Sequence, residues 1–558
     1  MTESQAKPPR PQLPSLLSAG LKRFLIVAIG VAGLLLADTV YLVLVRLADR
    51  VGLAPFALGA DTLPHFYQFL LLAHTAVGIL LVSVMAVFLV AHLPKVWRRF
   101  HAASAWSGIA YAVLGVTLLV TGLFILSAAA TRENQWAWWT HVIASSVVVG
   151  AYVVHRVVSF TRPNALAFAR YLGAVSAGAL ALFLTHGALV LAGGGAVTAQ
   201  RSAGAGGPDR DIQELLAGRF GPSGWVPVAA VPPASPFFPS ATTTTTGEYL
   251  AARILTTPGF GTPRDLVRAE VAERGFVQEA RIGAESCETC HPDVVDQWAA
   301  SAHRFASFNN PFYEATIMDM RRGALESNPW IEEHAASFPD DVDGVGRAKS
   351  KWCSGCHDPA LMLAGTMGRE IDRGSLEAQA GLTCLACHAI DRIHDQTGNG
   401  NYNIANEQED PYLFPSSTPG SARRYLHDLA VKARPAVHKA RLLKPFHRES
   451  VFCATCHKVS LTEPVNNYRW LRGQDDFDNW DDSGVALNAS RTFYLPPSKR
   501  VCQDCHMPFE PAPRGDVAAD NGMVRSHRFL AVNTALAYVR GDTATVRRIE
   551  EFLSDQKL

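Results

Sequence analysis

The chain has 558 residues, 48% of them hydrophobic, and a formal charge of +1 at pH 7. That length exceeds a single domain, and the nearly neutral charge argues against nucleic acid as a partner. The averages conceal a division, because residues 1–195 are largely apolar, whereas residues 196–558 have the composition of a soluble protein and hold all ten cysteines.

Five apolar stretches in the first part are long enough to cross a bilayer, which takes about 20 residues. They cover residues 24–46, 69–92, 105–126, 140–158 and 171–191. Helices of soluble proteins have polar and apolar faces, whereas a stretch such as AVGILLVSVMAVFLVAH has none. Residues 1–195 therefore predict a five-helix transmembrane bundle in contact with membrane lipid.

Positive charges indicate the orientation of this bundle. They gather before the first stretch, after the second, and between the fourth and fifth, at Lys7, Arg10, Lys22, Arg23, Lys95, Arg98, Arg99, Arg156, Arg162 and Arg170. Positive segments stay in the cytoplasm, so five spans place the soluble part outside it. We expect a multi-pass protein of a bacterial-type inner membrane with a periplasmic C-terminal domain.

Residues 196–284 contain GAGGP, VPPASPFFPS and TTTTTG, a Gly/Pro/Thr bias that predicts a mostly irregular tether. Short helices are expected at Asp211–Ala217 and Pro263–Arg274. Residues 285–530 follow as a separate domain, and residues 531–558, which include TATVRRIEEFLSDQKL, predict a C-terminal amphipathic helix.

Five CxxCH motifs use every cysteine of the chain. They are CETCH at 287–291, CSGCH at 353–357, CLACH at 384–388, CATCH at 453–457 and CQDCH at 502–506. Two thiols three residues apart can add to the two vinyl groups of one haem, and the following histidine then reaches the iron as its proximal ligand. The motifs predict five covalent haem c. The attaching residues are Cys287, Cys290, Cys353, Cys356, Cys384, Cys387, Cys453, Cys456, Cys502 and Cys505, and the proximal ligands are His291, His357, His388, His457 and His506.

Other cysteine chemistry fits this pattern less well. Zinc sites use paired CxxC units, so five units would leave one unpaired, and zinc does not require a histidine after each unit. Disulfides suit an extracytoplasmic location, but a CxxC disulfide is usually redox-active and would not recur five times. A thioredoxin-like site needs a βαβ unit, and the sequence does not show one.

A haem iron in an electron carrier takes a second axial ligand, commonly histidine or methionine. Seven histidines of the soluble part lie outside the motifs. We predict distal ligands among His303, His394, His438, His447 and His527, with His334 and His427 in reserve. The spacing leaves open which histidine serves which iron. Weaker alternatives are Met318, Met320, Met362, Met367, Met507 and Met523, for which core packing or exposure is the simpler expectation.

The stretches from CETCH to WAASAH, GLTCLACHAI and PAVHKARLLKPFHRESVFCATCHK resemble the multihaem cytochromes c of the nitrifier tetrahaem cytochrome and hydroxylamine oxidoreductase group. The resemblance covers roughly residues 285–530. It implies a mostly helical, loop-rich fold around closely stacked, largely bis-histidine haems. The chain has no CxxCK motif, so the lysine-ligated haem of pentahaem nitrite reductases is absent. The tyrosine cross-link of hydroxylamine oxidoreductase maps onto no residue here, and the group contains both electron carriers and enzymes.

The apolar part also contains histidines, and ionisable residues in membrane spans are functional candidates. His74 and His92 are eighteen residues apart, and His141 and His155 are fourteen apart, about five and four helical turns, so each pair faces one side of its helix. We predict that His74 with His141 and His92 with His155 hold one or two haem b.

His101 is an alternative partner for the inner pair, and His186 is expected to be a helix-packing residue. The stretches FHAASAWSGIAYAVLGVTLLVTGL and THVIASSVVVGAYVVHR resemble membrane cytochrome b helices.

Together these patterns predict a mostly α protein that transfers electrons between quinol or quinone and another redox protein outside the cytoplasm. No acid–base pair or substrate pocket can be recognised, so we favour an electron carrier over a catalyst with its own substrate. Two alternatives stay open. One open haem would allow reduction or oxidation of a small nitrogen or sulfur compound, and without haem b the membrane part would be only an anchor.

Overall fold

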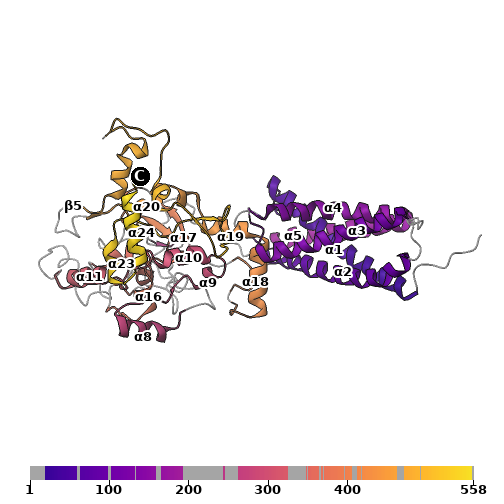
Figure 1. Cartoon of the computed structure of the whole chain (residues 1–558), viewed down its shortest axis with the longest axis horizontal. Coiled ribbons are helices and arrows are strands. Elements are labelled where there is room, and N and C mark those ends of the chain that lie inside the picture. Colours follow the sequence, from indigo (N-terminus) through magenta and orange to yellow (C-terminus); the bar gives the residue numbers. More distant parts are fainter. Residues whose placement is uncertain are drawn as a thin grey trace, which may run out of the picture. The chain divides into compact units, whose positions relative to one another are not determined.

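The computed structural model describes residues 19–58, 63–97, 102–131, 133–158, 165–192, 243–244, 262–323, 347, 350 and most of 351–555, the gaps there being 364–365, 368–369, 395, 405–410, 416, 462–470 and 491. The chain forms two compact units, which are shown in Figure 1. The first consists of Met1–Val197 with Asp428–Pro435, and the second of Thr198–His427 with Ala436–Leu558.

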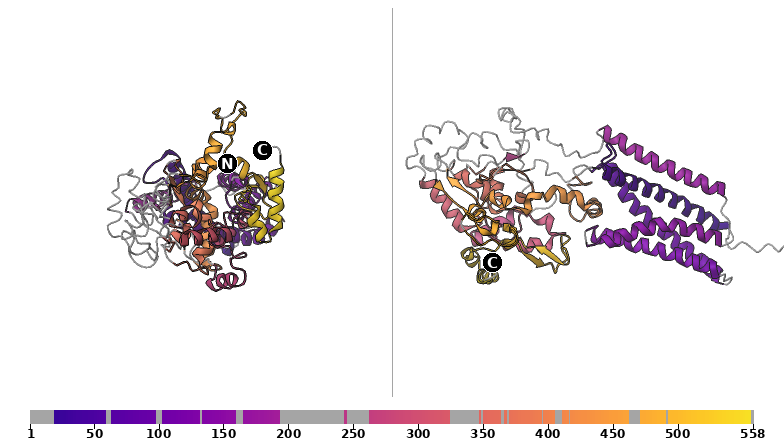
Figure 2. Two further views of the ribbon diagram at one scale, coloured as in Figure 1. Left: turned by 90° about the vertical axis from the view of Figure 1, so that its left-hand side faces the viewer. Right: turned by 90° about the horizontal axis from the view of Figure 1, so that it is seen from above.

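The first unit is built from five long helices, which lie side by side in Figure 2. They are α1 Ala19–Val51, α2 His65–Trp97, α3 Ala102–Ala128, α4 Gln135–Val158 and α5 Ala165–Leu191. All five are long and apolar enough to cross a membrane. The predicted spans are therefore confirmed, and the chain is a membrane protein by this criterion.

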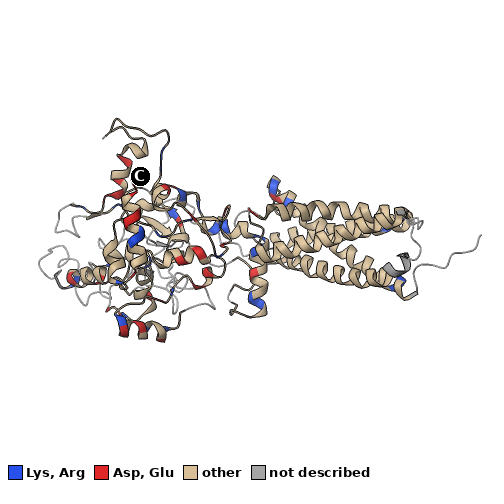
Figure 3. Ribbon diagram, in the orientation of Figure 1, with Lys and Arg blue, Asp and Glu red and all other residues tan. Residues whose placement is uncertain are grey.

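Helix packing in the first unit uses small residues, as is common where lipid surrounds the helices. Helix α1 packs against α5 and α2, and α3 packs against α4. Between α1 and α5 a Cβ added at Gly178 would lie 3.6 Å from the Cβ of Ala37, and Ala179 and Val175 are buried beside it. Charged residues are sparse along these helices and frequent in the second unit (Figure 3).

The second unit consists of short helices and loops. Its helices are α8 Arg264–Arg274, α9 Glu285–Glu288, α10 Pro292–Ala299, α11 Pro311–Gly323, η3 Lys351–Cys353, α14 Ser354–His357, α15 Pro359–Leu363, α16 Leu376–Gln379, α17 Cys384–His388, α19 Pro435–Leu442, η4 Pro445–Arg448, α20 Ser450–Ala454, α21 Asp476–Asp481, η5 Gly484–Ala486, α22 Cys502–His506, α23 Thr534–Val539 and α24 Thr543–Ser554. Helix α18, Ala422–Ala433, divides between the units at residue 428. The expected helix before residue 275 is confirmed as α8, whereas 211–217 lies outside the described residues.

The strands of this unit are short and form small sheets. They are β1 Thr243–Thr244, β2 Ile390–Ile393, β3 Tyr402–Ile404, β4 Ser460–Leu461, β5 Leu471–Arg472, β6 Phe509–Pro511 and β7 Met523–Arg525. Strand β3 lies between β1, to which it is parallel, and β2, to which it is antiparallel. The pairs β4–β5 and β6–β7 are antiparallel.

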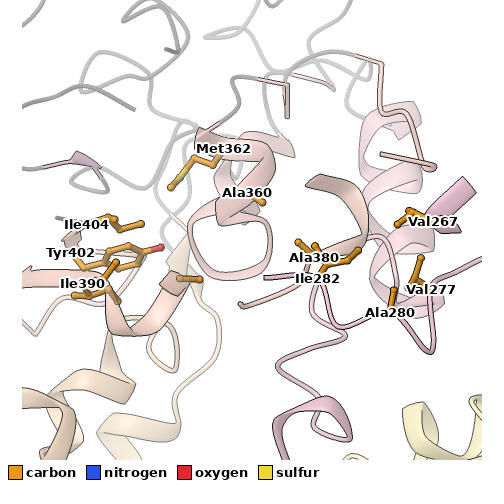
Figure 4. Close-up of a cluster of buried hydrophobic side chains, with 12 residues drawn as sticks. Val267, Val277, Ala280, Ile282, Ala360, Met362, Ala380, Ile390, Tyr402 and Ile404 are labelled. Atoms are coloured by element: carbon orange, nitrogen blue, oxygen red, sulfur yellow. The ribbon is translucent and has the colours of Figure 1, made fainter. Parts of the chain in front are cut away.

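The main apolar cluster of the second unit packs directly against the CxxCH segments. Figure 4 shows Val267, Val277 and Ile282 in one group of side chains and Ile390 and Tyr402 in another. Ala386 and Ala389, in and next to the third motif, belong to the same cluster. The hydroxyl of Tyr402 donates to the carbonyl of Gly355 inside the second motif.

A buried segment, Ser301–Asn309, fixes the loop that follows the first motif. The guanidinium of Arg304, only 2% exposed, donates to the carbonyls of Val277 and Ala280. The amide of Leu382 donates to the carbonyl of His303 at 2.9 Å. Burying a guanidinium is costly unless its donors are satisfied, so these contacts specify one path for the segment.

The C-terminal segment forms two helices where one was expected. Gly541 adopts a left-handed conformation, with φ of 72°, between α23 and α24. The Asp542 side chain then accepts a hydrogen bond from the amide of Thr545 at 2.9 Å and caps α24. A left-handed glycine followed by an aspartate N-cap ends one helix and begins another.

Replacing Gly381 with alanine tests the crossing at Arg304. Gly381 has a φ of +61°, and an added Cβ would lie 1.9 Å from the Arg304 carbonyl oxygen. We expect a loss of about 3 kcal/mol or more, because the clash is with backbone. The measurement is thermal unfolding of the full-length protein in detergent, followed by circular dichroism.

The matched control is Gly420→Ala, which has a φ of +78° but no atom within 4 Å of the added Cβ. Its cost should be only about 1–2 kcal/mol, from backbone strain alone. Equal shifts in Tm for the two variants would contradict the tight crossing.

Candidate haem-binding sites

Each CxxCH motif folds into a single helical turn. In the first motif the amide of His291 donates to the Cys287 carbonyl at 2.8 Å, and in the fourth His457 donates to Cys453 at 2.8 Å. Residues i and i+3 of a helix lie on one face, so the two thiols of each motif point the same way. All ten cysteines are free and half-buried.

The five motif histidines share one hydrogen-bond arrangement at Nδ1. The acceptors are Asp516 Oδ1 for His291 at 3.0 Å, the Ala306 carbonyl for His357 at 2.9 Å, the Leu442 carbonyl for His388 at 2.7 Å, Asp476 Oδ2 for His457 at 3.1 Å and the Leu530 carbonyl for His506 at 2.8 Å. A carbonyl or carboxylate can only accept, so these contacts favour a proton on Nδ1. At His457 the Gln474 amide nitrogen also lies 3.1 Å from Nδ1, beside the Asp476 carboxylate. The unprotonated Nε2 is then the available ligand atom, as in metal-bound histidines.

A simple distance tests whether two imidazoles could share one iron. A metal–imidazole bond is about 2 Å, so two trans nitrogens lie about 4 Å apart and the ring centres roughly 6 to 6.5 Å apart. Among the described residues of the second unit, three pairs have this separation. The ring centres lie 6.3 Å apart for His291 and His438, 6.3 Å for His388 and His527, and 6.2 Å for His303 and His457.

Burial keeps several of these rings neutral, which metal ligation requires. Desolvation, with a further contribution from neighbouring histidines, lowers the pKa of His303 to about 3 and that of His388 to about 3. The pKa of His527 is also lowered by desolvation, and its Nδ1 donates to the Arg525 carbonyl at 2.9 Å. His527 therefore has the same available Nε2 as the motif histidines.

The remaining two motif histidines have aromatic neighbours in the described part of the chain. The ring of Tyr313 stacks on His357 with centres 4.5 Å apart. Phe552, on α24, lies 5.7 Å from the ring of His506. The reserve candidate His334 falls outside the described residues. We therefore assign no distal ligand to the irons of His357 and His506.

Three other candidates make different contacts. His394 is exposed, and its Nε2 lies 2.7 Å from Asn403 Oδ1. His447 is stacked 5.2 Å from His388, closer than one shared iron allows, and its Nε2 lies 3.2 Å from the Cys387 carbonyl. His427 is buried against Tyr412. None of these three rings lies at the distance from a motif histidine that is expected for two imidazoles on one iron.

The cysteines show which motifs are neighbours. Side-chain hydrogen bonds join Cys287 to Cys384, Cys356 to Cys456 and Cys453 to Cys502. The bond from Cys384 lowers the pKa of the Cys287 thiol to about 7. The first motif thus lies beside the third, and the fourth beside both the second and the fifth, an arrangement that would bring attached groups close together.

The first unit contains a fourth pair with the same separation. The ring centres of His74 on α2 and His141 on α4 lie 6.4 Å apart. Asp38 Oδ2 on α1 lies 3.3 Å from His74 Nδ1. The Thr121 hydroxyl lies 3.0 Å from His141 Nδ1 and donates to the Thr117 carbonyl at 2.6 Å, so it accepts the imidazole proton.

His155 is supported in the same way one repeat along the helices. The Ser107 hydroxyl lies 3.0 Å from His155 Nδ1 and donates to the Ser104 carbonyl at 3.0 Å. Glycine follows each hydroxyl residue. A Cβ added at Gly108 would lie 3.0 Å from His155 Cε1, and one added at Gly122 would lie 3.3 Å from His141 Cε1. Ser107 and Thr121 are fourteen residues apart on α3, and His141 and His155 are fourteen apart on α4. The two helices therefore contain the same histidine contact twice.

The inner partner of His155 is not established by ring distances. His92 stacks on Phe88, with ring centres 5.1 Å apart, and His101 lies outside the described residues. His186 is buried, and its Nδ1 lies 2.9 Å from the Tyr41 hydroxyl, consistent with helix packing. The predicted pairing of His92 with His155 stays a prediction.

No protein-family model, curated protein or solved structure matches the chain. Within the described residues, histidine, cysteine and acidic side chains also form no group of three or more that could hold a bare metal ion.

Sequence reasoning missed the residues that hold the imidazoles. Asp516 and Asp476 lie 225 and 19 residues from the histidines they contact, and the other acceptors are backbone carbonyls without a sequence signature. One signal was present in the membrane part. Ser107-Gly108 and Thr121-Gly122 repeat at the same interval as His141 and His155.

His527 and His447 both approach His388, so they provide a matched test. Only His527 has the separation expected across one iron. If a haem is bound there, His527→Ala should convert one haem from low-spin to high-spin, whereas His447→Ala should leave the spin states unchanged. EPR of the oxidised full-length protein measures this. A high-spin signal in His447→Ala alone would reverse the assignment.

Proposed function

We propose that the chain is a membrane-bound pentahaem cytochrome c that carries electrons between the quinone pool and a redox protein outside the cytoplasm. In each motif an S–H would add across each vinyl C=C, so that sulfur bonds one carbon and the hydrogen ends on the other. The observation that carries the proposal is that Nδ1 of each of the five motif histidines lies within hydrogen-bond distance of an oxygen acceptor, which leaves Nε2 of the neutral ring as the ligand atom.

Bound haem supplies one-electron redox chemistry through its iron. The chain's own residues would set ligand geometry and basicity. The carboxylates of Asp516 and Asp476 would raise the basicity of His291 and His457, whereas carbonyls serve the other three motif histidines. His303, His438 and His527 would occupy distal positions, and the partial burial of His303 and His527 would limit the access of water to them.

In the membrane unit we assign one haem b to His74 and His141, and a second to His155 with His92 or His101. Quinol oxidation releases two electrons and two protons, and the electrons would leave one at a time toward the haem c domain. Haem c attachment occurs outside the cytoplasm, in agreement with the orientation that the positive residues predict. We therefore place the second unit in the periplasm.

An enzymatic role is the second candidate, favoured by one observation. Among the described residues His357 and His506 have aromatic rings, and no imidazole ring at the separation expected for one iron, in contact with them, so either iron could bind a small nitrogen or sulfur compound. A cavity of about 380 Å³ lies elsewhere in the described residues, beside Lys458, Arg472 and Asp478, and is lined by neither histidine. We therefore rank the electron carrier first.

Mass spectrometry of the denatured chain tests covalent attachment. We expect five haem additions and no free thiol, because the ten cysteines form five CxxCH pairs. Replacing Cys384 and Cys387 together with serine should leave four additions, and the conservative neighbour variant Thr383→Ser should keep five. Two or fewer additions in the wild type would favour metal or disulfide chemistry.

Quinol oxidation tests the membrane haem. Acid–acetone should extract non-covalent haem from the wild type, and His141→Ala should slow reduction of haem c by a water-insoluble quinol about 10-fold or more, the usual range for lost metal-site support. His186→Ala, a buried histidine without a paired imidazole ring, is the control and should keep the wild-type rate. Equal rates in the two variants would remove the assignment of His141.

A further inference from the structure

Asp38 is a buried carboxylate in the middle of a membrane-spanning helix. It is 7% exposed and lies on α1, between Ala19 and Val51. Carboxylates inside spans are rare because burying the charge is costly, so they need a polar partner. Among the described residues the partner is His74, at 3.3 Å between Asp38 Oδ2 and His74 Nδ1. Within the described residues neither Asp38 oxygen nor His74 Nδ1 makes a hydrogen bond, so the 3.3 Å contact between them is an ion-pair distance and not a formed hydrogen bond.

The His74 ring also lies close to His141. The ring centres are 6.4 Å apart, and the Thr121 hydroxyl lies behind His141 at 3.0 Å from its Nδ1. Taken in order, these contacts join a carboxylate, two imidazoles and a hydroxyl. The 3.3 Å contact is at the long end for a hydrogen bond. A ligand bond on Nε2 would polarise the Nδ1–H and favour a shorter contact with the carboxylate.

We propose that Asp38 is a positioning residue that orients His74 and sets the reduction potential of the iron held by His74 and His141. The inference rests on the proposed function, because it requires haem b at this pair. The negative charge of Asp38 beside His74 would favour ferric over ferrous iron, since the ferric state carries more positive charge. The His155 site has a hydroxyl support from Ser107, and its Nδ1 contacts no carboxylate in the described residues. The two membrane sites would therefore differ in potential, with Asp38 lowering the outer one.

The test is a reductive titration of full-length protein in detergent, followed at the absorption of the acid–acetone-extractable haem. Asp38→Asn should keep that haem and shift its oxidation equilibrium 10- to 100-fold toward the ferrous form. That corresponds to a rise of about 60–120 mV at 59 mV per decade for one electron. Asp38→Glu restores the charge and should titrate close to the wild type.

Asp49→Asn is the matched control, because it removes the same charge from the same helix eleven residues away, about 16 Å along the axis. Asp49 lies 2.8 Å from Arg434. This variant should leave the potential unchanged. A general effect of charge would shift both variants equally, and that result would overturn the proposal.

A second neutral variant, Asp38→Ser, is needed in case Asp38→Asn loses the haem. Its hydroxyl carries no charge but can accept the hydrogen bond from His74 Nδ1. If both neutral variants lose the haem and Asp38→Glu retains it, the positioning role is supported. Loss in all three indicates a folding defect and overturns it, as does an unchanged potential in Asp38→Asn. Wild-type protein without extractable haem would instead show that the proposed haem b, and not the role of Asp38, is wrong.

Discussion

The hydrogen bond from the Leu382 amide to the His303 carbonyl is the contact on which the arrangement of the second unit depends. It joins the loop after the first motif to the turn before the third motif, 79 residues later. The turn can approach so closely only because Gly381 has no side chain, and Arg304 then closes the crossing by binding the carbonyls of Val277 and Ala280. A backbone contact held by a buried guanidinium leaves little freedom, so the His303 ring has a defined place 6.2 Å from His457.

A second constraint is the protonation of the motif histidines. An imidazole that donates through Nδ1 presents Nε2 as an acceptor, and five different acceptors produce that state. Two are carboxylates and three are backbone carbonyls. Carboxylates make their imidazoles stronger donors to a metal than carbonyls do. The sites of His291 and His457 would therefore favour the ferric state more than those of His388, His357 and His506, if burial were equal.

The parts predictable from sequence are those fixed by composition or local spacing. The five membrane helices follow from uninterrupted apolar length, and the facing thiols follow from the i, i+3 geometry of CxxCH. Distal partners depend on tertiary paths. His447 is six residues before Cys453, yet it packs beside His388. His527, which follows strand β7 and is more than 130 residues from His388 in sequence, has the separation from His388 that is expected for one iron. Nearness in sequence favoured His394 in the same way, and the β2–β3 hairpin instead brings it to Asn403.

The membrane helices combine a repeat with one exception to it. Helices α3 and α4 hold two histidines by the same device, a hydroxyl acceptor followed by a glycine that lets the imidazole approach. Two haem sites built on this arrangement alone would have equal character, and equal sites would give electrons no preferred direction. Asp38, on helix α1, would remove that equality. In the described contacts its carboxylate lies beside His74, the partner of His141, and no carboxylate lies beside His155. The lower potential would then belong to the site nearer the C-terminal end of α1. If the positive residues orient the bundle as we infer, that is the periplasmic half, where electrons from quinol would enter at low potential before passing outward.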